Sequence, residues 1–151
     1  MGSDTPPMTH IPPVPRRLRG LALLYGIGVF LWLTPEDDNI LVPVLFGAVG
    51  ATLLVIIQTL QRLGGKSIRT RTIPLSAALL GALAGLLTSP AAALIMLIKN
   101  AIHSHLFPDY MPEIFIAVLE RTPIWTLAGG LLGLSLSLAW LALRSAEESS
   151  Q

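Results

Sequence analysis

Long stretches without charged side chains are the feature of this sequence that most constrains its fold. Four such spans lie at residues 18–34, 40–60, 73–99 and 122–143. Their only charged residues, Arg19 and Lys99, stand at or near the end of a span. A membrane-spanning helix needs about 20 apolar residues, with about 17 as the lower limit. The first span is close to that limit and the other three exceed it, so we expect an all-α integral membrane protein with four transmembrane helices.

The overall composition disfavours a soluble alternative. Hydrophobic residues make up 52% of the 151 positions and charged residues only 13%, against about 25% charged in soluble domains. Helices that are apolar on all sides would need more polar sequence around them than this chain has. The first span is also unlike a cleaved signal peptide, because "TPEDDN" and not a small-residue cleavage site follows it. We therefore expect it to be retained.

The distribution of Lys and Arg predicts the orientation of the helices. One side of the predicted membrane domain carries Arg16, Arg17, Arg19, Arg62, Lys66, Arg69, Arg71 and Arg144. The other side carries only Lys99 and Arg121. Positive loops stay cytoplasmic, so both termini should be cytoplasmic. Because the chain has no organelle transit pattern, we expect a multi-pass protein of the bacterial plasma membrane.

The predicted domain organisation is simple. Residues 16–144 form one membrane domain in contact with the lipid bilayer. Residues 1–15 contain five prolines and should form an extended, polyproline-like or disordered cytoplasmic segment. Residues 145–151 should form a short solvated tail.

Small residues recur at every fourth position in the last two spans. The stripes are Ala77, Gly81, Gly85 and Ser89 in one span and Gly129, Gly133 and Ser137 in the other. In lipid, helices associate where small residues let their backbones approach closely. We expect these two helices to form a tight antiparallel pair, although glycine is also simply common in membrane helices.

The third span is too long for one straight helix along the membrane normal. Its 26 uncharged residues, 73–98, would rise about 39 Å, against a hydrocarbon core of about 30 Å. Pro90 offers a place for a kink because it lacks the amide donor of a helix interior. We expect one kinked helix. The alternative is a break after Ser89 with a re-entrant second half.

Polar residues cluster where the third span ends. Lys99, Asn100 and His103 form a candidate outer vestibule, and Lys99 and His103 share a helical face. His103, His105 and Asp109 form a weak candidate for a zinc or copper site. Either histidine is also a weak candidate axial ligand for haem or a chlorophyll-type pigment. The simplest interpretation is a polar helix end at the water interface with no bound metal or cofactor.

Residues 112–121 form a further amphipathic segment in the same outer loop. Pro112 and Glu113 are typical of a first helical turn. The segment is too short to span a bilayer, so we expect an interfacial helix on the outer surface. It would contact a partner or, alternatively, act as a lid.

The spans lack the groups that membrane catalysis and proton transport require. The chain has no Cys, which excludes thiolate chemistry, and no Asp, Glu, Arg or His lies in the middle of a span. No base lies within reach of a span serine, and no phosphate-binding loop or dinucleotide motif is present. The positive-inside rule explains the basic loop, so nucleic acid is not an expected partner.

Three functional hypotheses remain open. The first is a non-catalytic small subunit that packs with other membrane-protein subunits in a larger complex, such as a respiratory or photosynthetic one. The second is a small transporter or channel, as a homo-oligomer, with its vestibule at Lys99, Asn100 and His103. The third is a carrier of a cofactor or metal bound by histidine.

Overall fold

The protein is predominantly helical, as expected for an all-α chain. The computed structural model describes residues 8–35, 39–103 and 108–149, with side chains up to residue 147. The elements are β1 (Met8–His10), α1 (Arg16–Trp32), α2 (Leu41–Leu63), β2 (Ser67–Arg69), η1 (Thr70–Thr72), α3 (Ile73–Ile102), α4 (Pro112–Glu120) and α5 (Thr122–Ser149).

Among the described residues, three helical segments are long and apolar enough to cross a membrane. They are Leu41–Leu63, Thr70–Ile102 and Pro112–Glu147. The helix of the first predicted span, α1, has only 17 residues, and its first turn contains Arg16, Arg17 and Arg19. These charges shorten its apolar part, which explains why α1 differs from the other three.

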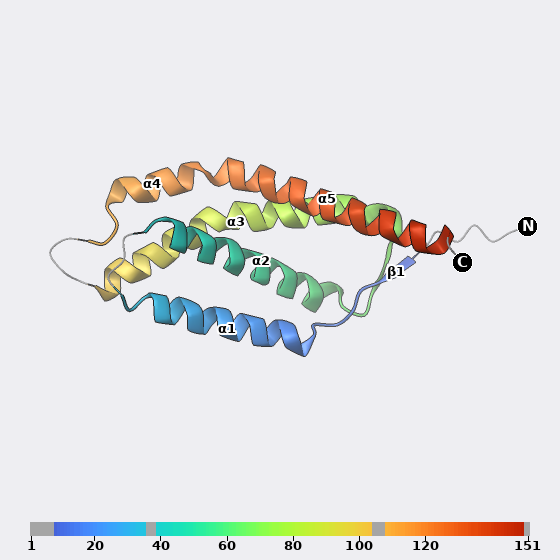
Figure 1. The fold of residues 1–151 in the computed structure, drawn as a ribbon, viewed down its shortest axis with the longest axis horizontal. Helices are drawn as coiled ribbons and strands as arrows, with labels where there is room; N and C mark the ends of the chain where they lie inside the picture. Colours follow the sequence, from blue (N-terminus) through green and yellow to red (C-terminus); the bar gives the residue numbers. More distant parts are fainter. Residues whose placement is uncertain (1–7, 36–38, 104–107, 150–151) are drawn as a thin grey trace, which may run out of the picture.

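The four long helices form an open row. Figure 1 shows α3 between α2 and α5, with α1 on the far side of α2. The main helix contacts follow the same order, α5 with α3, α3 with α2, and α2 with α1. Successive helices run antiparallel, so β1 and the end of α5 lie at the same end of the molecule (right in Figure 1). The row leaves α1 without a single buried residue.

The backbones of α3 and α5 are in direct contact through their glycines. A Cβ atom added to Gly81 would meet the carbonyl oxygen of Gly129, and one added to Gly133 would meet the carbonyl oxygen of Ala77. Gly85 likewise faces the carbonyl oxygen of Trp125. Any side chain at these positions would separate the helices. Close contact of this kind is the main source of helix association in lipid.

A single glycine also brings the backbone of α2 close to that of α3. A Cβ atom on Gly47 would lie 2.6 Å from the carbonyl oxygen of Thr88 and 2.7 Å from the amide nitrogen of Ala92. Gly47 is therefore the point at which α2 crosses α3. Neighbouring Ala51 and Val55, on the same face of α2, are also buried.

The helix α3 continues through Pro90 to Ile102 without a break. In Figure 1 its last turns (yellow) diverge from α5 and approach the end of α1. The missing amide of Pro90 permits such a change of direction.

The helix α4 comes after α3 in the chain and runs nearly in line with α5. Its Val118 is buried, and Ile114 and Phe115 pack on the core. This course differs from the predicted helix flat on the membrane surface, because α4 continues the direction of α5 and the apolar segment Pro112–Glu147 includes both helices.

The described part of each terminal segment contains regular secondary structure. The predicted cytoplasmic segment 1–15 contains β1, which pairs antiparallel with β2 in the loop between α2 and α3. The pairing places Thr9 opposite Ile68, and the hydroxyls of Thr9 and Thr70 are hydrogen-bonded at 3.0 Å. At the other terminus, α5 extends to Ser149, so residues 145–149 of the predicted tail are helical. Residues 1–7 lie outside the described part.

A pair of glycine substitutions tests the α3–α5 contact. Gly81→Ala should destabilise the fold by about 1–3 kcal/mol because the new methyl group meets the backbone of α5. Gly26→Ala is the matched control, since a Cβ atom there meets nothing within 4 Å. It should be neutral or stabilise by up to about 1 kcal/mol, because alanine favours helix over glycine. Unfolding in mixed detergent micelles measures both; equal effects would contradict a backbone contact at Gly81.

Candidate functional site

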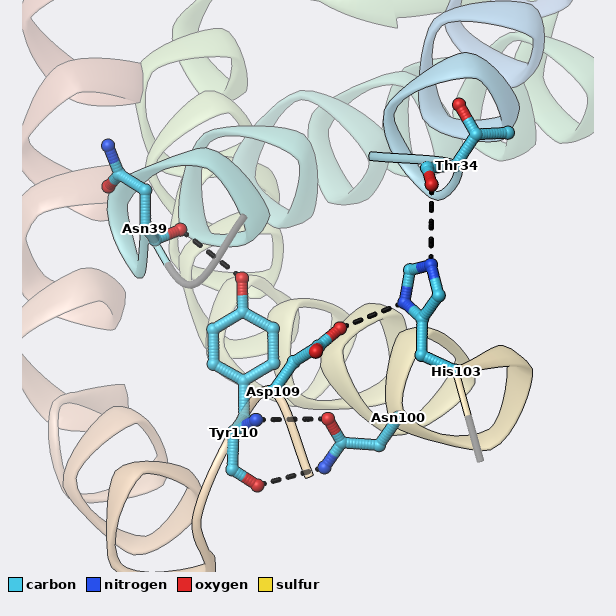
Figure 2. A network of polar contacts seen from close by, with 6 residues as sticks. All are labelled: Thr34, Asn39, Asn100, His103, Asp109 and Tyr110. Carbon is cyan, nitrogen blue, oxygen red and sulfur yellow. Dashed lines mark hydrogen bonds and ion pairs between the residues drawn. The ribbon is translucent and has the colours of Figure 1, made fainter. Parts of the chain in front are cut away.

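The polar residues after the third span meet at one end of the helix row. Figure 2 shows Asn100 and His103 at the end of α3, together with Asp109 and Tyr110 from the segment before α4. Thr34 and Asn39, from the segment between α1 and α2, complete the group. We call these six residues the outer cluster. It connects three parts of the chain that are far apart in the sequence.

The side chain of Asn100 holds the segment before α4 against α3. Its Nδ2 donates to the carbonyl oxygen of Tyr110 at 2.8 Å, and its Oδ1 accepts from the amide of Tyr110 at 3.0 Å. One primary amide thereby satisfies both backbone groups of one residue. Asn suits this role because it carries a donor and an acceptor side by side.

The imidazole of His103 lies between two oxygen atoms. His103 is the C-cap of α3, and its amide donates to the carbonyl oxygen of Lys99 at 3.0 Å. Its Nδ1 is 2.9 Å from Asp109 Oδ2, and its Nε2 is 3.3 Å from the carbonyl oxygen of Thr34. Because ionised carboxylate and carbonyl oxygens only accept hydrogen bonds, the ring forms both bonds when both nitrogens carry a proton. In that form His103 ties the end of α1 to the segment before α4.

Tyr110 anchors the outer cluster in the core. Its side chain is fully buried and packs with Ala92, Met96 and Val118. Its hydroxyl donates to the carbonyl oxygen of Asn39 at 3.3 Å, just before α2 begins. A buried phenol usually needs such a partner. Tyr110 thus joins the start of α2 to α3 and α4.

Lys99 is buried within the protein. Its exposed fraction is 0%. Its Nζ lies 4.2 Å from the centroid of the Trp32 ring and 5.8 Å from that of the Tyr110 ring. Both distances allow cation–π attraction, which is strongest where water is excluded. Of the three predicted vestibule residues, Lys99 is therefore packed between aromatic rings, while Asn100 and His103 are engaged in hydrogen bonds to other segments.

The described residues hold no cluster of three or more His, Cys, Asp or Glu side chains that could bind a metal ion. Of the three candidate ligands, His103 and Asp109 lie together, and their nearest nitrogen and oxygen are hydrogen-bonded to each other. His105 lies outside the described residues. The described part of the site offers one imidazole and one carboxylate, and the structure gives both a role in connecting segments.

The predicted packing residues lie along α3 and α5. Ala77, Gly81 and Gly85 face α5, and Gly129 and Gly133 face α3. Ser89 and Ser137 are both buried. Ser137 Oγ donates to the carbonyl oxygen of Leu134 at 2.7 Å, whereas Ser89 Oγ has no partner among the described atoms. Pro90 is exposed on α3.

Four residues of the site were not predicted from the sequence as members of it. Trp32, Thr34, Asn39 and Tyr110 contribute a ring, two backbone carbonyl groups and a buried phenol. Tyr110 directly follows Asp109, and an aromatic residue in a polar loop is a usable signal for a buried anchor. Backbone carbonyl groups leave no signal in the sequence, so the roles of Thr34 and Asn39 as hydrogen-bond acceptors could not be predicted from it.

Comparisons of the chain with protein-family models, with curated proteins and with solved structures found no match.

Replacing Asn100 tests whether the outer cluster holds the fold together. Asn100→Ala removes both hydrogen bonds to Tyr110 and should lower the free energy of unfolding by about 1–3 kcal/mol, because two partly buried backbone groups lose their partner. Gln58→Ala, at an exposed amide on α2, is the control and should change little. Unfolding by detergent titration gives both values. An Asn100 variant as stable as the control would contradict the structural role of the amide.

Proposed function

We propose that the protein is a small, non-catalytic integral membrane subunit that packs with other membrane proteins in a larger complex. It would cross the membrane four times with both termini on the cytoplasmic side. The positive-inside distribution of Lys and Arg supports this orientation, and a bacterial plasma membrane is the proposed location.

The observation that carries this proposal is the open row of helices. Four helices that close into a bundle each bury a stripe of side chains against their neighbours. Here α1 buries no residue, and many of its large side chains face outward, among them Leu23, which is 67% exposed, and Phe30, which is 69% exposed. The row α1–α2–α3–α5 therefore leaves wide apolar faces. Faces of this kind suit a protein whose neighbours complete its packing.

The strand pairing supports a spanning role for the short helix α1. β1 precedes α1 and pairs with β2 between α2 and α3, whereas Thr34 follows α1 and meets His103 at the opposite end of the molecule. The helix α1 thus connects the same two ends as α2, α3 and α5 (Figure 1). A membrane that contains those three helices would contain α1 as well.

The packing of the outer cluster and of Lys99 favours a structural subunit over a transporter. A vestibule needs its polar groups accessible to water and to solute. Lys99 is fully buried beside Trp32, and Asn100 holds Tyr110 through two hydrogen bonds. These contacts connect segments of the chain, and none of them requires a solute.

Native extraction tests the proposal directly. The protein, extracted from its own membrane in mild detergent, should migrate as part of a larger particle, and mass spectrometry should identify constant partner subunits. Leu23→Ala together with Phe30→Ala should lower the partner-to-protein ratio about tenfold or more, the effect of removing interface anchors.

The control keeps the same positions apolar. Leu23→Ile together with Phe30→Leu should preserve association, and carbonate extraction should show both double variants in the membrane. A wild-type protein that migrates alone, without partners in any mild detergent, would contradict the proposal.

A further inference from the structure

A long groove lies between α2 and α5, with α3 as its floor. Its volume is about 890 Å³, within the range of about 300–1,000 Å³ typical of sites for small molecules. The floor includes Ala77 and Ala84, and the walls include Thr52 of α2 and Leu136 of α5. The groove is separate from the outer cluster and shares no residue with it.

One end of the groove is closed by helix packing. The lining residues of α3 fall within 73–88, the half of the helix that follows β2. At Thr88 the floor ends, because Gly47 brings the backbone of α2 against Thr88 and Ala92. An occupant can enter from the side or from the open end, and it cannot continue along α3 past this crossing.

The groove covers only part of the predicted span 73–99. Its lining runs fifteen helical steps along α3, which rise about 22 Å, and nineteen steps along α5 from Trp125 to Arg144, which rise about 29 Å. A transmembrane helix of a partner needs a path across the full hydrocarbon core of about 30 Å, and the closed end at Thr88 interrupts such a path along α3. The closed end therefore favours a lipid from one leaflet over a transmembrane helix of a partner.

The open end of the groove is positively charged. Arg144 and His10 line it, and the guanidinium carbon of Arg144 lies 4.1 Å from the centroid of the Trp140 ring. Lys66 precedes β2, and Arg69 is the last residue of β2, opposite Met8 of β1. Glu147 lies three positions after Arg144. The basic side chains of Arg144, Lys66 and Arg69 outnumber this carboxylate. Tryptophan is typical of the headgroup level, and arginine binds phosphate in bidentate fashion.

We propose that the groove binds one anionic phospholipid from the leaflet on the Arg144 side. The acyl chains lie on the small residues of α3, and the phosphate is held at Arg144. Basic pockets between transmembrane helices bind lipid headgroups in this way. The proposal requires that the helices enter a bilayer, but it does not depend on partner subunits.

Native mass spectrometry of the purified full-length protein tests the proposal. The protein is equilibrated with equal amounts of phosphatidylglycerol and phosphatidylcholine in mild detergent. Wild type should retain one lipid, with phosphatidylglycerol preferred. Arg144→Gln should lower that preference about fivefold, the effect of one cation at a membrane surface. Arg62→Gln, a basic residue of α2 outside the groove, is the matched control and should keep the preference.

A second pair of variants tests the groove itself. Thr52→Phe should fill it and abolish lipid retention, whereas Leu54→Phe, an exposed position of α2 that does not line it, should retain the lipid. If Thr52→Phe fails to fold, the comparison of Arg144→Gln with Arg62→Gln still tests whether the groove binds an anionic phospholipid.

Several results would overturn the proposal. Equal retention of the two lipids by wild type would do so, as would full retention by a folded Thr52→Phe variant. Loss of the lipid on addition of inorganic phosphate would show that the site recognises free phosphate and not a phospholipid. A dimer that forms in wild type and is lost in Thr52→Phe would show that a second copy of the chain occupies the groove.

Discussion

Direct contact between the backbones of α3 and α5 is the interaction on which the rest of the structure depends. Gly81 and Gly129 meet without any side chain between them, and Gly47 brings α2 onto the other part of α3. The helix α3 is thus fixed from two sides, and α1 is attached through α2. In a bilayer, where apolar side chains gain little by meeting each other, such contacts determine which helices are neighbours.

The two ends of the row are held by different means. At one end, Asn100, His103 and Tyr110 connect the loops by hydrogen bonds. At the other end, β1 and β2 join the N-terminal segment to the loop before α3. Between these ends the Tyr25 hydroxyl of α1 donates to the carbonyl oxygen of Phe46 of α2 at 2.9 Å. The rest of the middle of the row is held mainly by packing, and wide apolar faces stay exposed.

Much of the helical arrangement could be predicted because apolar runs and small-residue spacing are local properties of a sequence. The runs at 40–60, 73–99 and 122–143 indicated the three helical segments that can span a membrane. The fourth-position spacing from Gly81 and from Gly129 indicated faces that do meet in the structure. Four membrane crossings and the orientation of the termini remain proposals.

Other features depend on contacts between distant residues, and the sequence gives no local signal for them. The pairing of β1 with β2 joins residues about 60 positions apart, and short strands near prolines carry little pattern. The carbonyl groups of Thr34 and Asn39 become partners only when the segments meet. The open row could not be predicted either, because a leucine that faces lipid and a leucine that faces another helix look the same in a sequence.

The most direct test of the account is the side of the membrane on which each end of the row lies. The chain contains no Cys, so single cysteines placed at Thr9, Thr34, Thr70, Asp109 and Ser145 can be labelled with an impermeant thiol reagent in intact cells. The account predicts that Thr34 and Asp109 react from outside and that Thr9, Thr70 and Ser145 react only after the membrane is opened. Labelling of both Thr9 and Thr34 from outside would contradict it, because α1 would then not cross the membrane and the open row of four spanning helices would not exist.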